Sequence, residues 1–111
     1  MSDTVEAFEG ARVAVLTAPD LFRLDAVITP DSVRVIVRNM SGLPLAFRPD
    51  GYPRPVHVQG GDLGELALRP GHHQLAFTLG ETEVRVVLAT LRALERGTVQ
   101  VTGQAIVRPR S

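Results

Sequence analysis

The feature that most constrains the fold of this chain is the pattern between residues 32 and 47, SVRVIVRNMSGLPLAF. Apolar side chains take every second position on both sides of a break at residues 39–42, at Val33, Val35, Val37, Leu43, Leu45 and Phe47. Successive side chains of a strand point to opposite faces, so this period of two places one apolar row against a core. The stretch predicts a strand, a short turn and a second strand that pairs with the first.

Short apolar runs of the same type recur through the chain, and Gly, Pro and Asp turns separate them. Further strands are expected at residues 12–17, 21–28, 56–59, 63–68, 72–79 and 98–107. Many short strands with this spacing are typical of a β-sandwich or barrel, and 111 residues is the length of one domain. We therefore expect an all-β fold, a single-domain antiparallel β-sandwich or partly open barrel. It would span residues 11–108, with a flexible N-terminal arm at 1–10 and a tail at 109–111.

The segment EVRVVLATLRALER, residues 83–96, fits two patterns. At helical spacing, Val84, Leu88 and Leu91 share one face, with Thr82 and Gly97 as possible caps. At a period of two, residues 84–89 form a strand. We favour the strand, followed by one short helix around residues 88–96, over a continuous helix. In the last strand, Gly103 is expected to mark a bulge.

Composition excludes several classes of protein. The chain has no cysteine, so it has no disulfide, no thiolate nucleophile and no cysteine zinc site. Its 12 basic and 12 acidic residues cancel, and no basic cluster of the kind that attracts nucleic acid is present. The N-terminus is acidic and polar, unlike a signal peptide, and no apolar run has the length of a membrane span. We expect no nucleic-acid partner, no membrane insertion, and a place in the cytoplasm or a virion.

No catalytic or cofactor motif is present. The three histidines, His57, His72 and His73, lack the spacing of a metal motif, although Asp50, Asp62 and Glu65 are acidic residues within reach in sequence. Adjacent histidines in a strand point to opposite faces, so His72 and His73 are not expected to share a metal. No serine lies in a nucleophile elbow, and GGDLG at residues 60–64 is explained by a turn. We predict no catalytic residue, no bound metal and no cofactor.

The residues that point to binding are a stiff loop and a row of arginines. In the loop Arg48–Pro55, prolines limit the ordering entropy lost on binding, and tyrosine and arginine are frequent at interface hot spots. The candidate interface residues are Arg48, Asp50, Tyr52, Arg54, Arg34 and Arg38. Arg34 and Arg38 face outward on their strand, where Arg23 and Arg85 would extend a basic stripe suited to an acidic partner. The alternatives are a plain connection in which Tyr52 folds back on the sandwich, and a solvated sheet face.

Two stretches resemble the broad group of immunoglobulin-like sandwiches that includes fibronectin type III modules. They are Val33–Asn39 followed by Ser41-Gly42, and Leu94–Val101 with its Gly97-Thr98 corner. Val99 and Gln100 stand where fibronectin type III modules usually place a tyrosine, and the tryptophan and paired cysteines of true immunoglobulin domains are absent. The resemblance implies a binding or spacer module.

These observations favour a non-enzymatic protein-interaction or structural β-sandwich. Its partner would be another protein or a second copy of itself, in a homo-oligomer or a larger assembly such as a virion or surface structure. A different hypothesis is a small proteinase inhibitor that presents residues 48–55 with Arg48 or Arg54 entering a protease pocket. A third is a metal- or ligand-binding β-barrel that uses His57 and His72.

Overall fold

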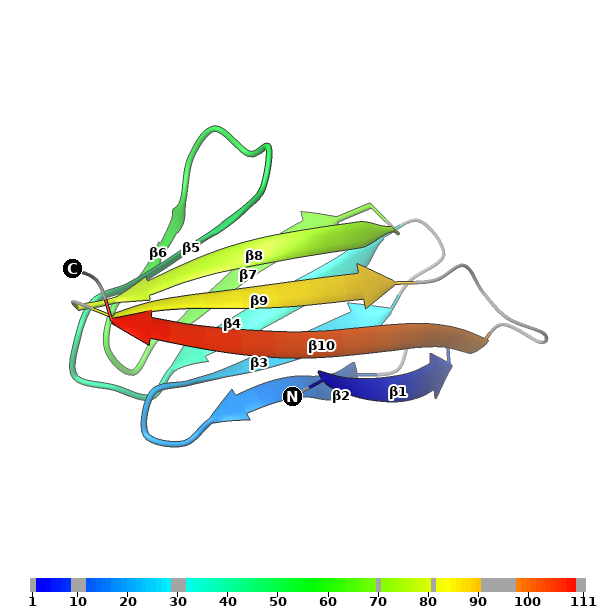
Figure 1. The fold of residues 1–111 in the computed structure, drawn as a ribbon, viewed down its shortest axis with the longest axis horizontal. Helices are drawn as coiled ribbons and strands as arrows, with labels where there is room; N and C mark the ends of the chain where they lie inside the picture. Colours follow the sequence, from blue (N-terminus) through cyan, green and yellow to red (C-terminus); the bar gives the residue numbers. More distant parts are fainter. Residues whose placement is uncertain are drawn as a thin grey trace.

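The computed structural model describes residues 2–8, 12–28, 32–69, 71–80, 82–90 and 98–109, which form two antiparallel sheets packed face to face (Figure 1). One sheet has the strand order β1-β10-β9-β8-β5-β6, and the other has the order β2-β3-β4-β7. The strands are β1 (Ser2–Phe8), β2 (Arg12–Ala18), β3 (Phe22–Ile28), β4 (Val33–Asn39), β5 (Leu45–Pro49), β6 (Val56–Val58), β7 (Leu63–Leu68), β8 (His72–Leu79), β9 (Thr82–Thr90) and β10 (Thr98–Pro109). The expected antiparallel sandwich is confirmed, and neither sheet closes into a barrel.

The core lies between the sheets and follows from the alternation along each strand. Three phenylalanines meet there: Phe77 stacks on Phe22 of the opposite sheet at 4.7 Å between ring centroids, and on Phe47 of the neighbouring strand at 5.5 Å. The valines of β4 are all buried, as are Leu45 and Phe47 of β5. The inward row expected from residues 33–47 is therefore confirmed, except that Leu43 is exposed.

The pairing expected between the two strands of residues 32–47 is wrong. Strand β4 pairs with β3 and β7, whereas β5 pairs with β6 and β8 in the other sheet. The segment between them crosses from one sheet to the other, and Asn39 holds that crossing. Its buried side-chain amide donates to the carbonyls of Leu43 (2.8 Å) and Val58 (3.0 Å), and its Oδ1 accepts from the N–H and the hydroxyl of Ser41.

Other expectations at the ends of the chain also change. Residues 2–8, expected within a flexible arm, form β1, which pairs in register with β10 from Ser2↔Gln104 to Phe8↔Thr98. Strand β10 continues to Pro109, two residues past the expected end. Its register runs through Gly103 without a shift, so the bulge expected there is wrong. The irregularity lies in β2, between Ala14 and Leu16.

The ambiguous segment resolves as a strand over its first part. Residues 82–90 form β9, so a continuous helix over 83–96 is wrong, and residues 88–90 of the expected short helix are extended. Residues 91–96 lie outside the described residues, as does the Gly97 of the proposed corner. The described part of the chain contains no helix, and hence none long and apolar enough to cross a membrane.

Candidate binding surfaces

The loop between β5 and β6 stands clear of both sheets (Figure 1). A turn starts it: the Tyr52 N–H donates to the Pro49 carbonyl at 3.1 Å, and Gly51 has φ 86°. A positive φ at the third residue of a turn defines type II and is the reason for glycine there. The Asp50 N–H also donates to the Gln74 carbonyl of β8 at 2.9 Å. The loop therefore leaves the sheet in a fixed direction.

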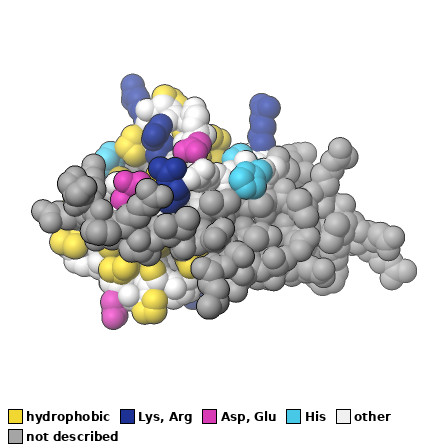
Figure 2. All heavy atoms as spheres, viewed as in Figure 1, with side chains coloured by type: hydrophobic (Ala, Val, Ile, Leu, Met, Phe, Trp, Pro, Cys, Tyr) yellow, Lys and Arg dark blue, Asp and Glu magenta, His cyan; other side chains and the backbone are white. Residues whose placement is uncertain are grey.

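Two of the four candidate residues in this loop hold its shape. The Arg48 guanidinium donates from Nη1 to the Tyr52 carbonyl at 2.9 Å. The Tyr52 side chain is half-buried and packs against the core, which favours the folded-back interpretation of this residue. Asp50 and Arg54 are exposed. Figure 2 shows basic and apolar side chains gathered on this projection.

The outward face of the four-stranded sheet carries the other predicted residues. Its outward residues form three cross-strand rows: Arg12, Val27, Arg34 and Ala67; Ala14, Asp25, Ile36 and Glu65; Thr17, Arg23, Arg38 and Leu63. Arg34 and Arg38 face outward, and Arg23 lies directly opposite Arg38. Arg85, predicted to extend this stripe, lies on β9 of the other sheet, so the stripe does not include it.

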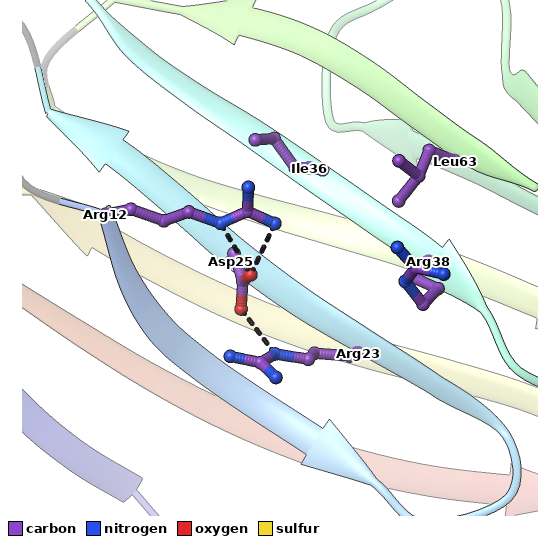
Figure 3. A pocket seen from close by; sticks show the side chains of 6 residues that line it. All are labelled: Arg12, Arg23, Asp25, Ile36, Arg38 and Leu63. Atoms are coloured by element: carbon purple, nitrogen blue, oxygen red, sulfur yellow. Dashed lines mark hydrogen bonds and ion pairs between the residues drawn. The ribbon is translucent and has the colours of Figure 1, made fainter.

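A buried carboxylate lies at the centre of this face. Asp25 is only 3% exposed because Arg12 and Arg23 close over it from the two neighbouring rows (Figure 3). Its Oδ2 accepts from Arg12 Nε at 2.9 Å and pairs with Nη2 at 2.8 Å, and its Oδ1 accepts from Arg23 Nε at 2.9 Å. Beside this cluster, a hollow of about 300 Å³ is lined also by Ile36, Arg38 and Leu63.

Arg12 and Asp25 were not among the candidates from the sequence. The outward position of Asp25 was readable, since Arg23 and Asp25 alternate with buried residues in β3. The contact of Arg12 with Asp25 could not be predicted from the sequence. It depends on the register of β2 against β3, and that register contains an irregularity.

The opposite face of the sandwich has a second, shallower hollow of about 400 Å³. Its lining combines apolar and small side chains with charged and histidine side chains: Ala46, Phe47, Pro55, Ala76 and Thr78, with Arg48, His57, Glu83 and Arg85. Arg85 is 3.6 Å from Glu83, so its charge is partly compensated.

The histidines do not converge on one point. His57 lies on β6 in the same cross-strand row as Thr78 of β8, while His72 is six residues before Thr78, about 20 Å along the strand. The His73 ring nitrogen Nε2 hydrogen-bonds with the Arg69 carbonyl. Among the described side chains, no three histidine or acidic groups gather as metal ligands.

Comparison of the chain with protein-family models, with curated proteins and with solved structures gave no match.

Proposed function

We propose that this chain is a non-enzymatic β-sandwich module that binds another protein through the projecting loop at residues 50–55. The observation that carries the proposal is that the loop is fixed at its base while its outer side chains stay free. Three features fix the base of the loop: the type II turn, the Arg48–Tyr52 hydrogen bond and the packing of Tyr52 on the core. A partner that meets such a loop loses little free energy in ordering it.

The strand order supports membership in the immunoglobulin-like group, including fibronectin type III modules. Strands β3, β4 and β7 face strands β6, β5, β8 and β9. This is the arrangement of strands A, B and E opposite C′, C, F and G in immunoglobulin-like sandwiches. Strands β1, β2 and β10 are additions at the margins. Many modules of this architecture bind proteins or space other domains, which fits a subunit of a larger assembly, in the cytoplasm or in a virion.

Arg54 is the residue that we expect to matter most for binding. It is exposed between Pro53 and Pro55, and no described group pairs with its guanidinium. Arginine is enriched among the residues that dominate interface energies.

The test is affinity capture from the native host, followed by rebinding of the captured protein in purified form. We expect Arg54→Ala to weaken that rebinding about tenfold, a typical loss for an interface hot spot. Arg69→Ala, which removes an exposed arginine outside the loop, is the matched control. A strict monomer in native mass spectrometry with no captured partner would refute the proposal.

A second candidate function is inhibition of a trypsin-like protease by the same loop. Its support is that Arg54 is presented on a rigid projection, while the Arg48 guanidinium is engaged with Tyr52. Arg54 would therefore enter the protease pocket, and Arg48 would brace the loop. Inhibition of trypsin should disappear with Arg54→Ala and weaken with Arg48→Ala. A wild-type chain without inhibitory activity rules this candidate out.

A further inference from the structure

We propose that the outward face of the four-stranded sheet binds a carboxylate of an acidic protein segment, through Arg38 and the half-exposed apolar side chain of Leu63. This surface belongs to the sheet that does not carry the projecting loop. The proposal for this surface does not depend on whether the projecting loop binds a partner.

The first support is that Arg38 has no partner for its charge among the described residues and lies opposite another arginine. Arg23 and Arg38 lie directly opposite each other on neighbouring strands, both pointing outward. Like charges in this position destabilise a sheet. Arg23 is paired with Asp25, but Arg38 makes no hydrogen bond or ion pair with any described residue. An external anion next to Arg38 would relieve the repulsion.

The second support is that the same face already holds one carboxylate. Arg12 and Arg23 grip the two oxygens of Asp25 at 2.8–2.9 Å (Figure 3). Arg23 uses only Nε for this contact, so its two terminal nitrogens remain for a further acceptor. The planar fork of arginine matches a carboxylate. In Figure 3 the Arg23 guanidinium extends toward Asp25 and away from Arg38, so a second carboxylate would be held by the fork of Arg38 itself.

The exposed leucine that lines the hollow favours a peptide over a phosphate. Leu63 of β7 lies opposite Arg38 with half of its surface exposed, whereas Ile36, beside Asp25, is only 7% exposed, so Leu63 supplies the accessible apolar contact. A phosphate gains nothing from Leu63, whereas an acidic residue followed by an apolar one places a carboxylate at Arg38 and an apolar side chain against Leu63. The carboxylates of Asp25 and Glu65 on the same face also limit its attraction for a nucleic-acid backbone.

The probe is a fluorescein-labelled peptide of alternating glutamate and leucine, followed by fluorescence anisotropy at low ionic strength. We expect saturable binding that weakens as salt is added, since exposed charges are screened. Arg38→Gln should weaken it about fivefold, Arg38→Lys less, and Leu63→Ser about threefold. Arg54→Gln, in the projecting loop, should leave it unchanged, which separates this site from the proposed function. Thermal melts of each variant confirm folding, and Arg38→Gln should not lower the melting temperature.

Three results would overturn the proposal. One is equal binding of a control peptide in which glutamine replaces glutamate, because the carboxylate would then not be recognised. Another is peptide binding that Arg38→Gln leaves intact. The last is displacement of the peptide by inorganic phosphate or a single-stranded oligonucleotide at the same concentration, which would assign the site to phosphate.

Discussion

At the scale of single residues, Asn39 is the polar side chain on which the crossing between the sheets depends. It is fully buried, and its amide makes four hydrogen bonds, to Ser41, Leu43 and Val58. Asn39→Ala removes the donor to the buried Val58 carbonyl and to the more exposed Leu43 carbonyl, so we expect a loss of about 2 kcal/mol in the free energy of unfolding. Urea denaturation followed by circular dichroism measures it. Asn39→Asp should also destabilise, because a carboxylate cannot donate to the two carbonyls.

The neighbouring Met40 provides the control for this prediction. Its side chain is 39% exposed and belongs to the same crossing. Met40→Ala should change the free energy of unfolding by no more than about 0.5 kcal/mol. A loss below about 1 kcal/mol for Asn39→Ala would show that the crossing is held by other contacts.

Asp25 allows a second prediction, because its removal leaves arginines facing each other. Arg12 and Arg23 are about half exposed and can rehydrate, so Asp25→Ala should cost about 1–2 kcal/mol, less than a fully buried pair. Adding Arg38→Gln should restore part of this loss by removing the charge opposite Arg23. The measurement is a double-mutant cycle by urea denaturation at low and high salt. Simple additivity of the two changes would contradict the proposed repulsion.

At the scale of elements, Gly51 fixes the direction of the projecting loop. Its φ of 86° is one that side-chain-bearing residues seldom adopt, so Gly51→Ala should lower stability by about 1 kcal/mol, measured by thermal melting. Gly42→Ala is the matched control, since Gly42 lies in another exposed turn without a positive φ, and an added Cβ there meets no atom within 4 Å. Equal melting temperatures for the two variants would show that the turn can relax.

Local patterns predicted most strands but not their partners. The period of two depends only on which side chains are buried, and it placed β2 to β8 within two residues of their ends. Whether β4 and β5 pair or separate depends on contacts with distant segments, such as the pairing of β4 with β7 and of β5 with β8, which no local pattern contains. Gly64 shows the same limit. From the sequence, Gly64 was assigned to a turn. In the structure a Cβ at this position would lie 2.6 Å from Val58 Cγ2 of the facing sheet, so close packing between the sheets requires glycine here.

The candidate surfaces, like the strand pairings, were predicted only in part from the sequence. Alternation placed Arg34 and Arg38 on the outward face, and the proline pattern located the projecting loop. Alternation gives the side of a strand on which a residue lies but not the sheet to which the strand belongs. Arg85 was therefore grouped with the wrong face, and Arg12 was missed beside Asp25.

At the scale of the whole molecule, the two sheets are interleaved along the chain. The four-stranded sheet takes β2, β3, β4 and then β7, while the six-stranded sheet takes the strands before, between and after them. Neither sheet is built from one continuous stretch. Each buries its inward face only against the other, as the stacking of Phe22 on Phe77 shows. The sheets should therefore fold together.

The single tyrosine provides a direct measurement of this cooperativity. The chain has no tryptophan, so tyrosine fluorescence comes from Tyr52 alone, where the projecting loop packs on the core. We expect its urea transition to coincide with that of the far-ultraviolet circular dichroism, as in two-state unfolding. Refolding should take milliseconds to seconds, since β1, β4 and β5 each pair with a strand distant in the sequence. A fluorescence transition at lower urea than the dichroism would mean that the loop separates from the core before the sheets unfold. The loop would then not be the fixed element on which the proposed binding depends.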